Sequence, residues 1–182
     1  MASELTVQTI KAPTSGGNAN KILIGSGQTL IQPGSVIQTI HLPSTNITRT
    51  ATTSSSFVAT YLYNTITPKF ANSKIIVRAA TTGNNNTNNG TNLVYTYYRT
   101  ISGGSATILR EGVSGGNYWG MGQVYAGDAR VQVPLIAEIV DAPNTTSETE
   151  YRLYIRSHNG GSVELPATTT EHVEMIIQEI AQ

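Results

Sequence analysis

Charged residues are scarce in this chain of 182 residues. They make up 12% of the sequence, about half of the ~25% that is typical of soluble proteins. Eleven basic residues balance eleven acidic ones, so the formal net charge is zero. Proteins that bind nucleic acid usually carry a basic stripe that displaces counterions from phosphates. The balance of charge therefore indicates that nucleic acid is not a partner.

Cysteine is absent, which excludes disulfides, a thiolate nucleophile and zinc–thiolate sites. No apolar run approaches the ~20 residues that a membrane-spanning helix needs, so we expect no membrane insertion. The first ten residues, MASELTVQTI, lack the basic start and the apolar stretch of a secretory signal peptide. No residue pattern calls for a cofactor, and we expect none.

A coherent set of catalytic residues is also missing. The segment Gly112-Val113-Ser114-Gly115-Gly116 matches G-x-S-x-G, but that motif needs a strand-to-helix turn around the serine. More glycine follows here, without a helical pattern. The acids and histidines elsewhere show neither the HExxH nor the EF-hand spacing of metal sites. We predict a non-enzymatic protein with no catalytic residue and no metal site.

Threonine, serine, asparagine and glycine take the place of the missing charges. An apolar content of 38% at zero net charge favours a folded chain over a disordered one, and the abundant Thr, Val, Ile and Tyr favour strands. Alternating segments bounded by Gly, Pro and Asn are expected to be strands. They cover residues 57–67, 74–81, 93–101, 106–111, 131–140, 151–157 and 172–180.

Several local features refine this prediction. Tyr151, Leu153 and Ile155 should face the core, and Pro134 indicates an edge strand or a bulge, because proline cannot donate to a ladder. Residues 82–91, TGNNNTNNGT, read as a polar loop. Residues 171–181 are the best helical candidate, although their VEMII centre suits a buried strand equally well. We predict an all-β fold, an antiparallel, jelly-roll-like β-sandwich of about eight strands.

Residues 1–43 differ from the rest, because their β-like pieces are short and separated by Gly and Pro turns. We predict an extended N-terminal arm over 1–43 and a sandwich domain over 44–182. The arm is either a solvated tail or a segment that docks on a partner by adding strands. The apolar residues that favour docking, and that we predict to contact a capsid or another subunit, are Ile22, Leu23, Ile24, Leu30, Ile31, Val36 and Ile37.

Aromatic residues gather in the glycine-rich segment 112–127, GVSGGNYWGMGQVYAG. Trp and Tyr are enriched at the centres of protein interfaces, and aromatic faces also stack on sugar rings. Tyr118, Trp119 and Tyr125 are therefore predicted to contact another subunit or a glycan. Core packing of Tyr118 and Trp119 is a third interpretation that the sequence leaves open.

Three stretches carry a resemblance to a known family. They are PGSVIQTI at 33–40, TTSSSFVATYLYNTITPKFANSKIIVRAA at 52–80 and EHVEMIIQEIAQ at 171–182. The second runs from a Ser/Thr tract through an ITP stop to an SKI strand. This order resembles a module in structural proteins of tailed bacteriophages, especially cyanobacterial and marine phages. The resemblance extends from Pro33 to the C-terminus, with a weakly matched middle.

The resemblance implies a virion protein, made in the host cytoplasm and exposed on the outer surface of the particle. It implies a trimeric head decoration (cement) protein that contacts the major capsid protein or another virion protein and also aids host adhesion. The alternative is a tail-fibre or receptor-binding module that recognises host-surface carbohydrate. The short chain without shaft repeats favours decoration.

Overall fold

The computed structural model describes residues 14–17, 31–42, 48–86, 91–110, 120–125 and 130–182. The chain divides into two compact units, Met1–Ile31 and Gln32–Gln182. In the first unit, residues 14–17 form a bend and a turn. In the second, two antiparallel sheets pack together, and the described residues contain no helix.

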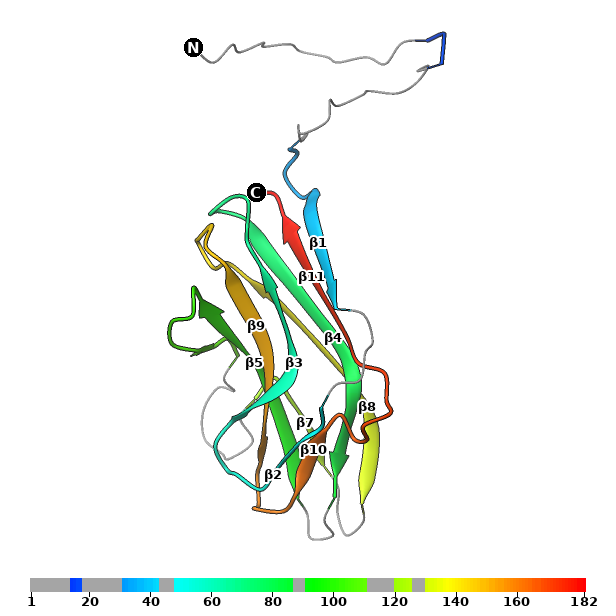
Figure 1. Ribbon diagram of the computed structural model, residues 1–182, viewed down its shortest axis with the longest axis vertical. Coiled ribbons are helices and arrows are strands. Elements are labelled where there is room, and N and C mark those ends of the chain that lie inside the picture. The colour runs from blue at the N-terminus through cyan, green and yellow to red at the C-terminus, as the bar shows by residue number, and fades with distance from the viewer. Residues whose placement is uncertain (1–13, 18–30, 43–47, 87–90, 111–119, 126–129) are drawn as a thin grey trace. The chain divides into compact units, whose positions relative to one another are not determined.

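The first sheet, sheet A, has the strand order β1-β11-β4-β10-β2, with β8 on the other side of β4 (Figure 1). The long strand β4 is its axis, since it pairs with β11 along one part, with β10 at its end and with β8 over most of its length. The strands are β1 (Val36–Leu42), β2 (Thr50–Thr52), β4 (Lys74–Asn85), β8 (Val131–Asp141), β10 (Val163–Leu165) and β11 (Glu174–Ile180).

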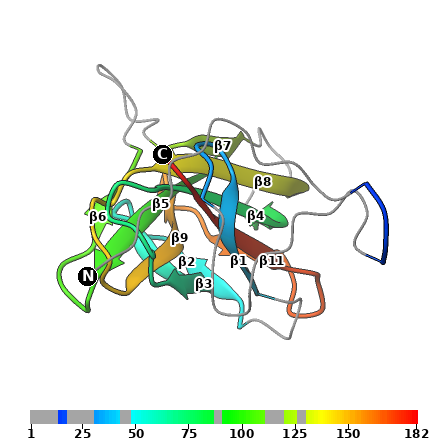
Figure 2. The same cartoon turned by 90° about the horizontal axis from the view of Figure 1, so that it is seen from above.

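The second sheet, sheet B, has the order β3-β9-β5-β6, and β7 also pairs with β5. Figure 2 shows the two sheets from above as separate layers. A turn at residues 102–105 joins β5 to β6, with Ser102 and Gly103 in the left-handed region at φ 48° and 69°. The strands are β3 (Val58–Ile66), β5 (Asn92–Ile101), β6 (Thr107–Ile108), β7 (Gly122–Tyr125) and β9 (Thr149–Ser157).

Alternate side chains from both sheets meet in one core. Tyr151, Leu153 and Ile155 of β9 are fully buried, as the alternation predicted. Tyr97 of β5 crosses the core, and its hydroxyl donates to the carbonyl oxygen of Ala137 in β8 at 3.2 Å. Burial raises the pKa of Tyr97, so this hydroxyl stays protonated and keeps its partner. The predicted antiparallel β-sandwich is confirmed.

The N-terminal boundary differs from the prediction. The compact second unit starts at Gln32, not at residue 44, and β1 pairs with β11 in sheet A. Val36 and Ile37, expected on an arm, therefore lie in a strand of the sandwich. The sequence of residues 36–42 alone does not predict a core strand. The strand forms because it pairs with β11, which lies at the other end of the chain. The resemblance that starts at Pro33 follows the structural boundary more closely.

The polar loop predicted at 82–91 also differs in its first half. Strand β4 continues to Asn85, and Asn84 and Asn85 are fully buried. The buried carboxylate of Glu164 makes this possible, since it accepts from Asn84 Nδ2 at 2.8 Å and from Asn86 Nδ2 at 3.0 Å. Arg49 completes the cluster at 3.3 Å from the same carboxylate. Polar residues therefore extend the strand here because each finds a buried partner.

A second buried carboxylate, Glu179 of β11, fixes the turn between β3 and β4. Its oxygens accept from the backbone N–H of Lys69 at 2.8 and 3.0 Å and of Phe70 at 3.1 Å. The Ser73 hydroxyl donates at 2.8 Å and Gln38 Nε2 at 2.6 Å. Burial favours the neutral acid, but these hydrogen bonds outweigh it and lower the pKa of Glu179.

Candidate functional site

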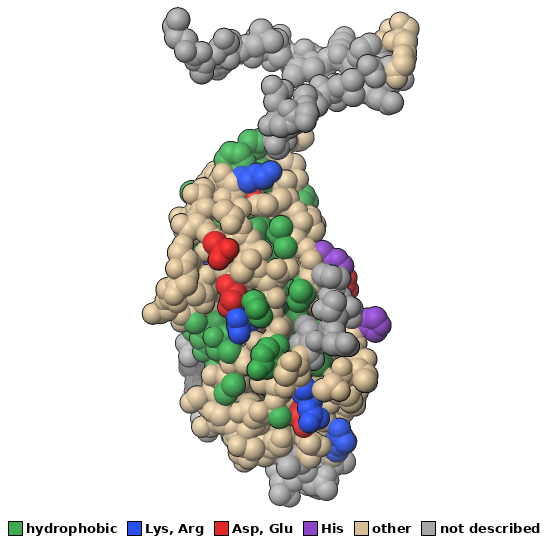
Figure 3. Space-filling model, viewed as in Figure 1, with side chains coloured by type: hydrophobic (Ala, Val, Ile, Leu, Met, Phe, Trp, Pro, Cys, Tyr) green, Lys and Arg blue, Asp and Glu red, His purple; other side chains and the backbone are tan. Residues whose placement is uncertain are grey.

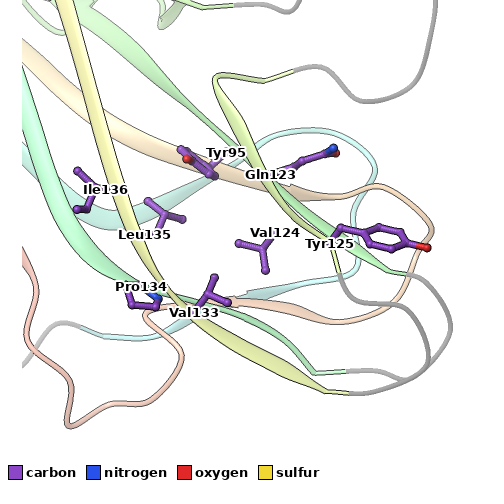
Figure 4. A pocket seen from close by; sticks show the side chains of 8 residues that line it. All are labelled: Tyr95, Gln123, Val124, Tyr125, Val133, Pro134, Leu135 and Ile136. Carbon is purple, nitrogen blue, oxygen red and sulfur yellow. The ribbon is translucent and has the colours of Figure 1, made fainter.

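The sandwich is open along one side, where β7 of sheet B approaches β8 of sheet A. A hollow of about 460 Å³ lies there (Figure 4). Within the described part of the chain β8 pairs only with β4, and β7 only with β5, so both are edge strands. The hollow is lined by Tyr95, Gln123, Val124, Tyr125, Val133, Pro134, Leu135 and Ile136.

Alternation along the two strands separates the inner from the outer lining. Val124 and Leu135 are buried and turned toward the core, whereas Tyr125 is 65% exposed and points away from the strands in Figure 4. A Cβ at position 122 would lie 2.3 Å from the Tyr95 hydroxyl oxygen, so a larger residue there would have to displace the Tyr95 side chain. The result is a hollow lined by mostly apolar side chains together with polar groups, with one exposed aromatic side chain at its rim.

Pro134 sits in the middle of the edge strand β8, opposite Thr82 of β4. This confirms the prediction that Pro134 marks an edge strand. Proline in an edge strand has its nitrogen on the open side, where no ladder hydrogen bond is lost. By the two-residue period of a strand, Ile136, Glu138 and Val140 then present backbone N–H and C=O groups to the same side. Proline and Glu138 limit unspecific pairing at such an edge.

The outer face of sheet A is unusually apolar for a sheet surface exposed to water. Ile136 is 76% exposed, and Val140 and Val36 are 52% and 51% exposed. The register places Ile136 beside Ala80 and Val140 beside Ile76. Antiparallel sheets with one solvated face normally alternate apolar-in and polar-out, and here the outer residues of β8 and β4 break that pattern. Figure 3, seen from the side of Figure 1, shows that uncharged polar groups and backbone predominate on that side of the molecule, with scattered apolar and charged side chains.

Arg99, Asp141 and Tyr151 tie the two sheets together at the C-terminal end of β8. Arg99 Nη1 donates to both carboxylate oxygens of Asp141, at 3.0 and 2.9 Å, and the Tyr151 hydroxyl donates to Asp141 at 2.8 Å. Burial, followed by the charge of Asp141 and the hydrogen bond to it, raises the pKa of Tyr151. The cluster closes this end of the sandwich edge.

Replacing Asp141 with alanine is expected to lower the free energy of unfolding by about 2–4 kcal/mol, because Arg99 and the Tyr151 hydroxyl lose their shared acceptor inside the protein. Urea unfolding followed by circular dichroism measures the change. The matched control is Arg78→Ala, which breaks an exposed ion pair with Glu138 in the same sheet and should cost less than about 1 kcal/mol. Equal losses in the two variants would show that the cluster contributes no more than a surface pair.

The residues proposed from the sequence are distributed over several regions. Ile22, Leu23, Ile24, Leu30, Tyr118 and Trp119 lie outside the described residues. Ile31 is 47% exposed, Val36 and Ile37 belong to β1, and Tyr125 lies at the rim of the hollow. Whether any of them contacts a partner stays a prediction.

The sequence analysis did not identify β8 as part of a site. A signal was present, because the segment VQVPLIAEIV carries apolar side chains on both faces of the strand. A strand with one face exposed to solvent needs them on one face only. Several of the acids and histidines, which show no metal-site spacing in the sequence, have partners in the protein. Glu174 contacts His41 at 2.8 Å, and Glu171 accepts from Thr82 and from Gln132. Within the described ranges, no group of His, Asp or Glu is arranged to hold a metal ion.

No protein-family model and no curated protein sequence matches this chain. Among solved structures, a chain from the structure of infectious bursal disease virus, Gx strain, is similar over 87% of this chain at 11% identity, with a TM-score of 0.41. The matched region spans 41% of that viral chain. Among the described residues, no helix is long and apolar enough to cross a membrane.

Proposed function

We propose that this protein is a non-enzymatic structural protein of a tailed-phage particle, a homotrimeric decoration (cement) protein on the head surface. The observation that carries the proposal is the edge strand β8, with a hollow lined by mostly apolar side chains on one side and exposed Ile136 and Val140 on the outer face. Apolar surface of this kind, left exposed, forgoes roughly 1.5–3 kcal/mol per large side chain. The resemblance at 33–40, 52–80 and 171–182 supports the particle as the place where it is covered.

The occupant of the β8 edge is the N-terminal segment 1–31 of a neighbouring copy. That segment forms a separate unit, and 31 extended residues reach up to about 100 Å. Its apolar residues Ile22, Leu23 and Ile24 suit a strand added to β8, where the ladder supplies affinity and the hollow accepts alternate side chains. Each contact joins two different surfaces, and such head-to-tail contacts form a ring when the rotation from one copy to the next closes. Three copies give the trimer, and the apolar outer face of sheet A is then available to the capsid protein.

The full chain is expected to be a trimer. The chain that lacks residues 1–31 is expected to be a folded monomer that no longer binds to phage heads prepared without the decoration protein. Light scattering gives the mass, and quantitative gel analysis of sedimented heads gives the occupancy. Ile136→Glu, which places a charge on the edge, should reduce occupancy at least tenfold. Thr107→Glu, at an exposed position of β6 in sheet B, changes the charge by the same amount and is the matched control that should decorate normally. Full occupancy without residues 1–31 would place attachment on the sandwich and overturn the role of the segment.

A second candidate function is a receptor-binding module of a tail fibre. The exposed Tyr125 beside the hollow favours it, since a solvent-facing aromatic ring suits contact with a host-surface glycan. The same decoration assay separates the two functions. A receptor-binding module binds host cells but leaves undecorated heads bare.

A further inference from the structure

A bulge in β3 exposes a tyrosine on the side of the sandwich opposite the β7–β8 hollow. Val58 and Ala59 pair with β9, and pairing resumes at Tyr63 after two extra residues. Thr60 bridges the gap, because its hydroxyl donates to the Leu153 carbonyl at 2.6 Å and accepts from Leu62 N–H at 3.2 Å. Bulges of this kind re-aim side chains, and Tyr61 within this one is 55% exposed.

The bulge borders a second hollow of about 460 Å³, between the edge strands β2 and β3. This volume lies within the ~300–1,000 Å³ of small-molecule sites. The lining residues are Arg49, Thr50, Ala51, Val58, Ala59, Thr60, Tyr61 and Arg152. Thr50 is 8% exposed, and its hydroxyl has no hydrogen-bond partner among the described residues. The hollow thus combines one exposed aromatic ring with several polar groups.

Both guanidinium groups at this hollow already hold a carboxylate. Arg152 donates to both oxygens of Glu150 at 2.9 Å, and Arg49 lies 3.3 Å from Glu164. Arg152 also lies over the Tyr63 ring, 4.0 Å from its centroid, which fixes the orientation of the guanidinium. The two ion pairs leave the site without net charge, so it offers no excess attraction to an anion. Hydroxyl groups, which donate and accept, match such a paired site.

We infer that the β2–β3 hollow binds a neutral saccharide. A pyranose ring stacks its apolar face on Tyr61, and its hydroxyls receive hydrogen bonds from Arg49 and Arg152. The polar lining disfavours an apolar ligand, and the neutralised arginines disfavour phosphate or a uronic acid. This site is separate from Tyr125, which lines the β7–β8 hollow. The inference does not depend on the decoration role.

Saturation-transfer NMR on the full chain tests the inference with maltotriose, cellotriose and chitotriose as neutral probes, and with glucuronic acid and inorganic phosphate as anionic ones. At least one neutral trisaccharide is expected to bind. Tyr61→Ala and Arg49→Ala should each raise the Kd at least tenfold, while Tyr61→Phe retains stacking and binds within about threefold.

Phe70→Ala removes an exposed aromatic ring at the β3–β4 turn, away from the hollow, and serves as the control with unchanged Kd. Binding of none of the three neutral probes at millimolar concentration would overturn the inference. Preferential binding of an anion would overturn it too. So would loss of binding in Tyr125→Ala with Tyr61→Ala unaffected, because the saccharide would then lie at the β7–β8 hollow.

Discussion

Removal of residues 1–43 is expected to lower the free energy of unfolding by at least about 3 kcal/mol relative to removal of residues 1–31 alone. The difference is strand β1. Its Ile40 and Leu42 pack against the core, and each large apolar side chain contributes roughly 1.5–3 kcal/mol on burial. Gln38 adds hydrogen bonds to Glu179 at 2.6 Å and to the Thr67 carbonyl at 2.8 Å.

Urea unfolding of the two truncated chains, compared with the full chain, measures this effect. The shorter deletion is the matched control, because both variants lack the first unit and only one lacks β1. Equal stability of the chains that start at residues 32 and 44 would mean that β1 does not stabilise the sandwich. The boundary of the sandwich domain would then be residue 44, as predicted from the sequence.

Replacing Glu179 with alanine is expected to cost at least about 3 kcal/mol, the second large effect. The substitution leaves the N–H groups of Lys69 and Phe70 and the Ser73 hydroxyl without their shared acceptor, and each unsatisfied buried donor costs about 1–3 kcal/mol. Glu174→Ala, in the same strand but half exposed, is the matched control and should cost less than about 1 kcal/mol. Similar losses in both variants would contradict a special role for Glu179.

The lowered pKa of Glu179 also predicts a pH dependence. Its stabilising contribution is fully present above the ordinary value of 4.5 and is lost as the pH falls below that value toward the lowered pKa of the folded state. Between pH 5 and pH 3, roughly, the intact chain should therefore lose more stability than Glu179→Gln, which has no proton to gain. An identical pH dependence in the two proteins would show that Glu179 does not titrate differently on folding.

The strands that follow a local alternation could be predicted from the sequence. Tyr151, Leu153 and Ile155 are buried as expected because one face of β9 packs on the core whatever the partner strand is. The features that depend on distant partners could not. β1 is a strand because β11 pairs with it. Asn84 can be buried because its side-chain amide donates a hydrogen bond to the carboxylate of Glu164.

The candidate sites show the same division. Tyr125 was proposed from its glycine-rich, aromatic surroundings, and it lies at the rim of a hollow. The rest of that hollow comes from β8 and from Tyr95, segments that only the packing of the two sheets brings together. The β2–β3 hollow depends on a two-residue bulge at Thr60, and the alternating pattern of 57–67 gives no sign of it.

Locating the protein on the particle tests the central proposal most directly. Cryo-electron microscopy of intact particles, with gold-labelled antibody against the chain as a second marker, measures where it sits and in how many copies. Decoration predicts density and label over the head surface, in groups of three copies, with residues 1–31 of one copy along β8 of the next. Label confined to the tail fibres, or particles without the protein, would contradict the account.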